Sequence, residues 1–86
     1  MNVLYFTSPS CRPCRSFGPL LASELGRLGV EPLRVDVATP DGLDKADSYG
    51  VSSTPTVVIE RDGEEISRFT GALLGSSLQD ALSVLR

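Results

Sequence analysis

The first 37 residues place an amphipathic helix between two short β-favouring segments, and this order severely restricts the possible folds. Residues 3–6 form an apolar run that suits a strand buried on both faces. Residues 33–37 alternate apolar and polar side chains, as a second strand would. The helix between them is expected from Arg12 to about Leu28, with Ser10 as its N-cap and an apolar stripe of Phe17, Leu20, Leu21, Leu25 and Leu28. Strands joined in this way form a parallel, right-handed βαβ unit.

The rest of the chain predicts a short helix, a hairpin and a closing helix. The short helix starts at Asp41, ends before Gly50 and carries Leu43, Ala46 and Tyr49 at three-residue spacing. Residues 56–60 and 65–69 flank an Asp-Gly turn, and the broken alternation at Ile66 and Phe69 indicates a β-bulge. Ser76 and Gln79 form a capping-box pattern ahead of the closing helix. The predicted order is therefore β-α-β-α-β-β-α.

Length and composition restrict the class of protein. The 86 residues leave room for one domain, residues 1–86. A net charge of −3 argues against nucleic acid or an anionic membrane as a partner. The acidic residues concentrate in residues 36–86, which carry a net charge of −5, whereas residues 1–35 carry +2. Because no apolar run is long enough to span a membrane, we expect a soluble, cytoplasmic protein.

Cys11 and Cys14 are the only cysteines, and the chain has no histidine. This composition excludes catalysis by a nucleophile paired with histidine, and it excludes a zinc site with four cysteine or histidine ligands from one chain. A disulfide that closes so short a ring removes little chain entropy from the unfolded state. A purely structural bridge is therefore a poor explanation for this pair.

The expected positions of the two cysteines give them different roles. Cys11 lies in the first helical turn, where free N–H groups and the helix dipole favour an anion, and Arg12 and Arg15 add positive charge. We therefore expect the pKa of this thiol to lie below the ordinary value of about 8.5, which makes Cys11 the nucleophile. Cys14 lies on the core-facing stripe and is expected to be the more buried, resolving thiol. Pro13 fixes a helical φ between them. The alternative is that the two cysteines lie together by chance in an unimportant loop.

On these residues the sequence resembles the thioredoxin-like superfamily over nearly its whole length. Residues 10–14 (Ser-Cys-Arg-Pro-Cys) correspond to the active-site segment of that family, and Pro19 matches its usual helix proline. Residues 49–56 look like the family segment that ends in a cis-proline, here Pro55, facing the disulfide. Residues 62–72 are similar to the family hairpin and the glycine after it. The resemblance implies a minimal thioredoxin fold, an α/β fold in which a four-stranded mixed sheet is flanked by three helices.

The resemblance also implies a function, a thiol–disulfide oxidoreductase that reduces disulfide-containing client proteins. Cys11 and Cys14 would be the catalytic pair. The residues implied to support this pair are Arg12, Pro13, Thr54 and Pro55. The residues implied to bind the client are Ser10, Ser53 and Gly71. The implied protein is a monomer that binds no cofactor or metal. Its electrons would come from NADPH through a separate flavoenzyme similar to thioredoxin reductase.

Departures from the family pattern leave alternatives open. Tyr5 replaces the buried acid that assists proton transfer in thioredoxins, Ser10 replaces a tryptophan, and Arg12 replaces a glycine. The glutathione-binding pattern of glutaredoxins is absent after Pro55, which favours protein disulfides as substrates. The alternatives are a glutaredoxin-like electron donor to ribonucleotide reductase, an interaction domain with incidental redox activity, and a dimeric module. In that module, the cysteines of two chains would share a zinc ion or an iron–sulfur cluster.

Overall fold

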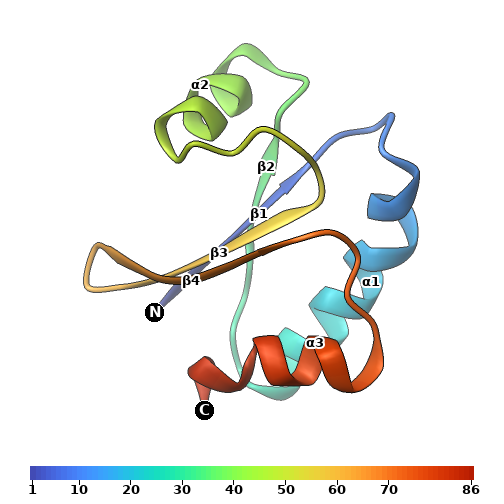
Figure 1. The fold of residues 1–86 in the computed structure, drawn as a ribbon, viewed down its shortest axis with the longest axis vertical. Helices are drawn as coiled ribbons and strands as arrows, with labels where there is room; N and C mark the ends of the chain where they lie inside the picture. Colours follow the sequence, from blue (N-terminus) through green and yellow to red (C-terminus); the bar gives the residue numbers. More distant parts are fainter.

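The apolar run near the N-terminus forms the strand β1 (Asn2–Thr7), which lies inside the sheet. In the computed structural model, which describes residues 1–86, β1 pairs in parallel with β2 (Leu33–Asp36). On its other side it pairs antiparallel with β3 (Thr56–Arg61), which in turn pairs antiparallel with β4 (Glu64–Thr70). The strand order is β2-β1-β3-β4. The predicted four-stranded mixed sheet is confirmed (Figure 1).

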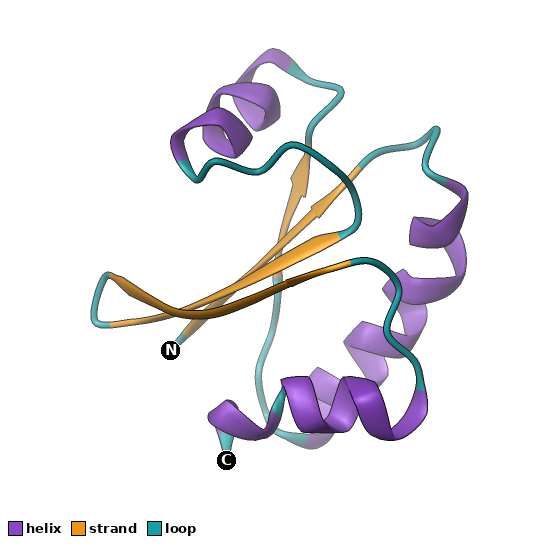
Figure 2. Ribbon diagram, viewed as in Figure 1, coloured by secondary structure: helices purple, strands orange, loops and turns teal.

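Three helices cover the two faces of this sheet. Helices α1 (Arg12–Arg27) and α3 (Gly75–Ala81) lie on one face, and α2 (Pro40–Ser48) lies on the other (Figure 2). A 3₁₀ turn, η1 (Ser83–Leu85), follows α3. The predicted element order is therefore confirmed. None of the helices has the length and apolar character that crossing a membrane requires.

Alternate residues of β1 contribute to two separate hydrophobic clusters. Val3 and Tyr5 pack with the α1 and α3 side, where the buried residues of the helices and of the α3 C-cap are Phe17, Leu21, Leu25, Leu78 and Leu82. Leu4 and Phe6 pack with the α2 side, where the other members of the cluster are Val35, Ala46, Val51 and Val58. A strand buried on both faces thus explains the uninterrupted apolar run in the sequence.

Several predicted details of the helices are wrong. The N-cap of α1 is Cys11 rather than Ser10. Helix α2 begins at Pro40, because Thr39 is its N-cap and proline is well suited to the first helical position. Helix α3 has Leu74 as its N-cap and no side-chain cap, so the capping box expected at Ser76 does not form, and the closing helix breaks into α3 and η1.

Three leucines assigned to apolar stripes or strand interiors are exposed. Leu20 is 44% exposed, Leu43 is 52% exposed and Leu33 is 54% exposed. Leu20 and Leu43 lie at the border of the buried face of their helices, and that face is narrower than the spacing of apolar residues predicted. Leu33 begins β2, an edge strand with one neighbour, and β2 ends at Asp36 rather than at residue 37.

The hairpin between β3 and β4 forms as predicted. Asp62 and Gly63 both have positive φ, 52° and 82°, which is the backbone that favours Asp-Gly in a two-residue turn. Ile59 pairs with Ser67 and Glu60 pairs with Glu65, so Ile66 is an extra residue on β4. The bulge predicted from the broken alternation is confirmed.

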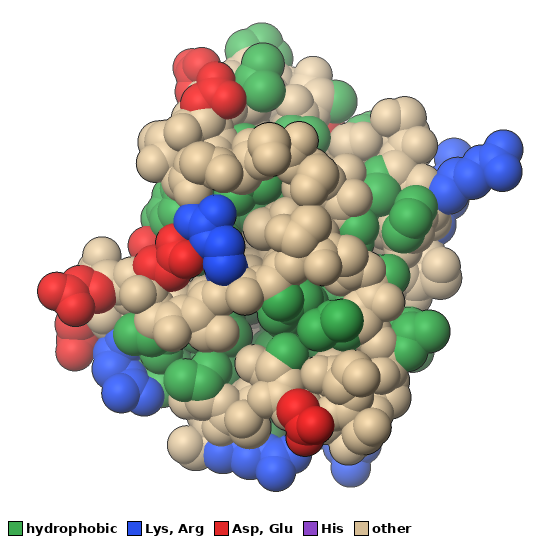
Figure 3. All heavy atoms as spheres, in the orientation of Figure 1, with side chains coloured by type: hydrophobic (Ala, Val, Ile, Leu, Met, Phe, Trp, Pro, Cys, Tyr) green, Lys and Arg blue, Asp and Glu red, His purple; other side chains and the backbone are tan.

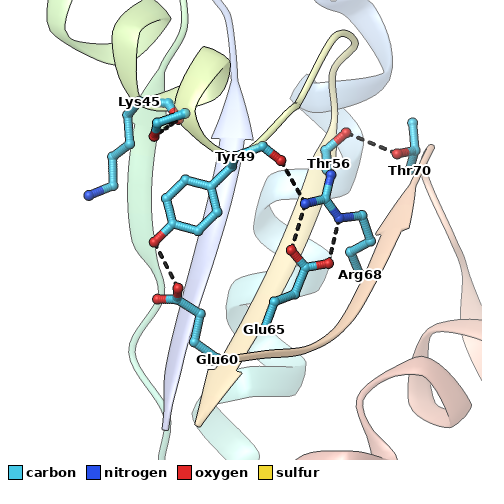
Figure 4. A network of polar contacts seen from close by, with 8 residues as sticks. Lys45, Tyr49, Thr56, Glu60, Glu65, Arg68 and Thr70 are labelled. Carbon is cyan, nitrogen blue, oxygen red and sulfur yellow. Dashed lines mark hydrogen bonds and ion pairs between the residues drawn. The ribbon is translucent and has the colours of Figure 1, made fainter. Parts of the chain in front are cut away.

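A polar network connects the end of α2 to this hairpin (Figure 4). The Arg68 guanidinium donates two hydrogen bonds of 2.6 Å to the Glu65 carboxylate and one of 2.7 Å to the Tyr49 carbonyl. The Tyr49 hydroxyl donates to Glu60 Oε2 at 2.8 Å. This hydrogen bond is the main cause of the raised pKa of Tyr49. The hydrogen bond from Arg68 is likewise the main cause of the lowered pKa of Glu65. The network fixes the chain immediately before residues 50–55.

Candidate active site

Cys11 occupies the start of α1, in the turn that follows β1. Its amide donates to the Ser8 carbonyl at 3.2 Å, and its Sγ accepts a hydrogen bond from the Cys14 amide at 3.3 Å. A capping side chain accepts from an amide of the first helical turn, and here sulfur takes the place of the usual oxygen. The predicted first-turn environment therefore exists, but the thiol itself is the cap. Ser10 is exposed, and its hydroxyl lies 3.1 Å from that of Ser8.

Cys14 forms a disulfide with Cys11, and the two Cα atoms are 5.3 Å apart. Cys14 is 5% exposed, whereas Cys11 is half-buried. Burial thus differs in the direction expected for a nucleophile and a resolving thiol. Only Cys11 has an open side from which a second molecule could approach.

Tyr5 lies next to Cys14. Its hydroxyl donates to the Cys14 carbonyl at 3.3 Å, and its ring packs edge-on against Phe17 with centroids 5.8 Å apart. Gly18 leaves room for the hydroxyl, since a Cβ there would lie 3.3 Å from it. The sequence did not reveal this contact, although a glycine within a helix is a signal of close approach by another group. The phenol ring of Tyr5 thus occupies the position at which the resemblance implies a buried acid.

Two further segments reach the same edge of the sheet. Phe6 pairs with Thr56 and Thr56 pairs with Thr70, so the residues just beyond these pairs lie at the edge from which Cys11 follows. The Thr54–Pro55 peptide bond is cis, and the carbonyl of buried Pro55 accepts a hydrogen bond of 2.9 Å from the Gly71 amide.

Side chains and main chain lock these segments together. The Thr56 hydroxyl donates to the Ser53 carbonyl at 2.8 Å and lies 3.1 Å from the Thr70 hydroxyl (Figure 4). Ser53 is exposed, whereas Thr54 is half-buried. Gly71 has a φ of 99°, which favours glycine over any residue with a Cβ. The fold therefore brings Ser53, Thr54, Pro55 and Gly71 to one edge, and the strand register places the cysteine loop at that same edge.

Positive charge gathers around the start of α1. Arg12 and Arg15 are exposed and have no acidic partner, since the only ion pairs are Arg27–Glu24 and Arg68–Glu65. Figure 3 shows basic side chains projecting where α1 begins, while acidic ones lie over α2 and at the β3–β4 turn. Arg12 and Pro13 occupy the first two helical positions. The chain holds no cluster of three or more His, Cys, Asp or Glu side chains that could bind a metal ion.

Comparison with known proteins identifies the family. The thioredoxin family model matches residues 1–84. The TPR repeat-containing thioredoxin TDX of Arabidopsis thaliana is 42% identical over 77 residues, which cover 86% of this chain and 19% of that protein. Thioredoxin 1 of Synechococcus elongatus is 30% identical over 77 residues, which cover 90% of this chain and 72% of that protein.

Solved structures agree with the sequence relatives. The structure of Fasciola hepatica thioredoxin superimposes with a TM-score of 0.84 at 30% identity, over 98% of this chain and 79% of that one. The chain spans about a fifth of the length of the A. thaliana relative and most of the length of the other two proteins. With its family model, its relatives and its fold in agreement, this chain belongs to the thioredoxin family.

Proposed function

We propose that this chain is a protein dithiol–disulfide oxidoreductase that reduces disulfides in client proteins. The observation that carries the proposal is the position of the Cys11–Cys14 pair. The disulfide begins α1 at the edge where residues 53–55 and Gly71 meet, and only its first sulfur is open to a partner. Membership of the thioredoxin family supports the same chemistry.

The reaction consists of two exchanges. In the reduced protein, the Cys11 thiolate attacks one sulfur of the client disulfide, and the other client sulfur leaves as a thiolate. Cys14 then loses its proton to solvent and attacks the Cys11 sulfur, so the second client sulfur leaves as a thiolate. Two electrons have passed to the client, and Cys11 and Cys14 form their disulfide.

The surroundings of Cys11 favour its thiolate. The Cys14 amide donates to its sulfur at 3.3 Å, and Arg12 and Arg15 are the charged residues of the first turn. Ser10 precedes Cys11, and both Ser10 and Ser53 are exposed. In this proposal an extended client segment lies along these two residues. In this proposal the disulfide is returned to the dithiol by a separate flavoenzyme that uses NADPH.

Trapping of mixed disulfides tests the roles of the two cysteines. Cys14→Ser should accumulate a covalent adduct with oxidised insulin or another disulfide protein, because the second exchange is blocked. Cys11→Ser should form no such adduct, and the double serine variant is the control for non-covalent association. Equal adduct formation by the two single variants would contradict the assigned roles. Turnover of insulin by wild-type protein with dithiothreitol measures the complete cycle.

A further inference from the structure

The largest cavity of the molecule lies beside the disulfide but apart from the proposed client edge. Its volume is about 540 Å³, within the range of roughly 300 to 1,000 Å³ that is typical of small-molecule sites. It is bounded by β1, α1 and the beginning of β2, and its wall includes Cys14. Cys11, residues 52–55 and Gly71 do not contribute to the wall. Client binding therefore leaves this cavity unexplained.

The charged residues of the wall are both basic. Arg15 reaches the cavity from α1 and Arg34 from β2, and neither has an ion-pair partner in the chain. Arg34 pairs with Tyr5 across the parallel ladder, so both side chains lie on the sheet face covered by α1. The other charged residue on that face of β2 is Asp36, which accepts a hydrogen bond from the Ala38 amide and does not line the cavity. The cavity therefore suits an anion.

The remaining polar groups of the wall are hydroxyls. Thr7 is only 2% exposed and lines the cavity, and its hydroxyl makes no side-chain hydrogen bond; because no fully enclosed side-chain polar atom of the chain lacks a partner, this hydroxyl keeps contact with the cavity. The Tyr5 hydroxyl has one partner, the Cys14 carbonyl, and retains capacity to accept a hydrogen bond. A hydroxyl that faces a cavity can both donate to and accept from water or a ligand. These groups could bind the oxygen atoms of an acid that the arginines attract.

Apart from Ser8, whose hydroxyl lies 3.1 Å from that of Ser10, the rest of the wall is apolar. It contains the rings of Pro9, Pro19 and Pro32 and the side chains of Leu21 and Ala22. Proline rings lose little conformational freedom when a ligand packs on them, so they offer a preformed surface to a flat hydrophobic body. An inorganic anion would leave this surface uncovered.

We propose that this cavity binds a small organic acid with a flat apolar body and one carboxylate or sulfonate group. The carboxylate faces Arg15 and Arg34, and the apolar body packs on the proline rings. This proposal goes beyond the proposed redox function and does not require it. Because Cys14 is part of the wall, any difference in affinity between the disulfide and dithiol forms would link binding to the redox state.

Titration of the oxidised protein with 1-naphthoate, followed by amide chemical shifts, tests the proposal. We expect saturable shifts at Tyr5, Gly18, Ala22 and Arg34, with a dissociation constant of about 0.1 to 1 mM for a ligand of this size. The neutral 1-naphthamide should bind at least about threefold more weakly. Arg34→Gln should weaken naphthoate binding by about three- to tenfold, since it removes an exposed charge.

A pair of helix variants separates the cavity from the general charge of the protein. Ala22→Glu places an acid in the wall and should weaken naphthoate binding at least about threefold, whereas Ser23→Glu adds the same charge at the next exposed position outside the wall. The amide spectra of both variants report whether they are folded. The proposal is overturned if naphthoate produces no saturable shifts, if the two variants bind it equally, or if sulfate competes as well as naphthoate binds.

Discussion

Replacement of Gly42 by alanine is a severe test of the packing between α2 and β2. Gly42 is buried, and a Cβ there would overlap the carbonyl oxygen of Asp36 and lie 2.5 Å from its carbonyl carbon. The Thr39 hydroxyl would be 2.9 Å away. That hydroxyl caps α2 by accepting from the Gly42 amide at 3.0 Å and donates to the Asp36 carbonyl at 2.9 Å.

The size of the effect follows from these distances. Carbon atoms normally approach to about 3.5–4.0 Å, so α2 must move away from the end of β2 by at least about 1 Å. Forcing a group into a packed site costs about 1–3 kcal/mol, and loss of the Thr39 cap adds about 1 kcal/mol. We expect Gly42→Ala to reduce the free energy of unfolding by about 2–4 kcal/mol, a large part of what a domain of this size has.

Gly26→Ala is the matched control, because the same methyl group added near the end of α1 meets no atom within 4 Å. Alanine is favoured over glycine in a helix by about 0.5–1 kcal/mol, so this variant should be more stable than the wild type. Urea denaturation of the oxidised proteins, followed by circular dichroism, gives both values. The packing argument fails if Gly42→Ala lies within 1 kcal/mol of the wild type, or if the two variants shift in the same direction.

Three further predictions concern single polar groups. Tyr5→Phe deletes the hydrogen bond to the Cys14 carbonyl without changing the ring, and chemical denaturation should show a loss of about 0.5–1.5 kcal/mol. Glu65→Gln should reduce the free energy of unfolding by about 0.3–1 kcal/mol at pH 7, because the hydrogen bond from Arg68 lowers the pKa of this half-exposed carboxyl. The stabilisation by the Glu65 carboxylate is present above its unfolded pKa of about 4.3 and is lost as the pH falls through its lower folded pKa, so urea denaturation at pH 2 should give equal values for the variant and the wild type. Arg12→Gln should slow alkylation of the proposed nucleophile by iodoacetamide at pH 7 about two- to fivefold at low salt, and an unchanged rate would remove this arginine from the mechanism.

The sequence predicted the parts of the fold that rest on strong periodicity. The buried run of β1 and the Asp-Gly turn formed as expected. Strand β2 also formed where the alternation predicted it, but Leu33 is exposed and the strand ends at Asp36. The bulge at Ile66 was also visible, because an extra residue breaks the alternation. These features depend on neighbouring residues, which a sequence displays directly.

The errors arose where distant residues decide the outcome. Ser10 is the better capping residue by type, but the turn after β1 directs the Cys11 sulfur at the Cys14 amide instead. Ser76 satisfies the capping-box pattern, yet the chain leaves β4 through Gly71 and Gly75, both with positive φ, and the N-cap of α3 is Leu74, two residues earlier. Helical spacing placed Leu43 on the apolar face of α2, but the side chain is exposed, because the spacing does not show how far the neighbouring elements extend over that face.

In the candidate site, too, local features could be predicted from the sequence and contacts between distant residues could not. The roles proposed for Cys11 and Cys14 rest on helix position, and the structure shows the predicted difference in their burial. The contact between Tyr5 and Gly18, and the approach of Arg34 to the cavity beside Cys14, depend on how α1 crosses the sheet. No local pattern reports that crossing.

The hydrogen bond from the Cys14 amide to the Cys11 sulfur has a consequence for local order in the two redox forms. In the disulfide the acceptor is neutral, whereas in the dithiol form it is the proposed thiolate, and a charged acceptor strengthens such a bond. Opening the covalent ring would therefore tighten the first turn of α1 rather than loosen it. The Cys14 amide proton should exchange with deuterium more slowly in the reduced protein, although the reduced chain has one cross-link fewer.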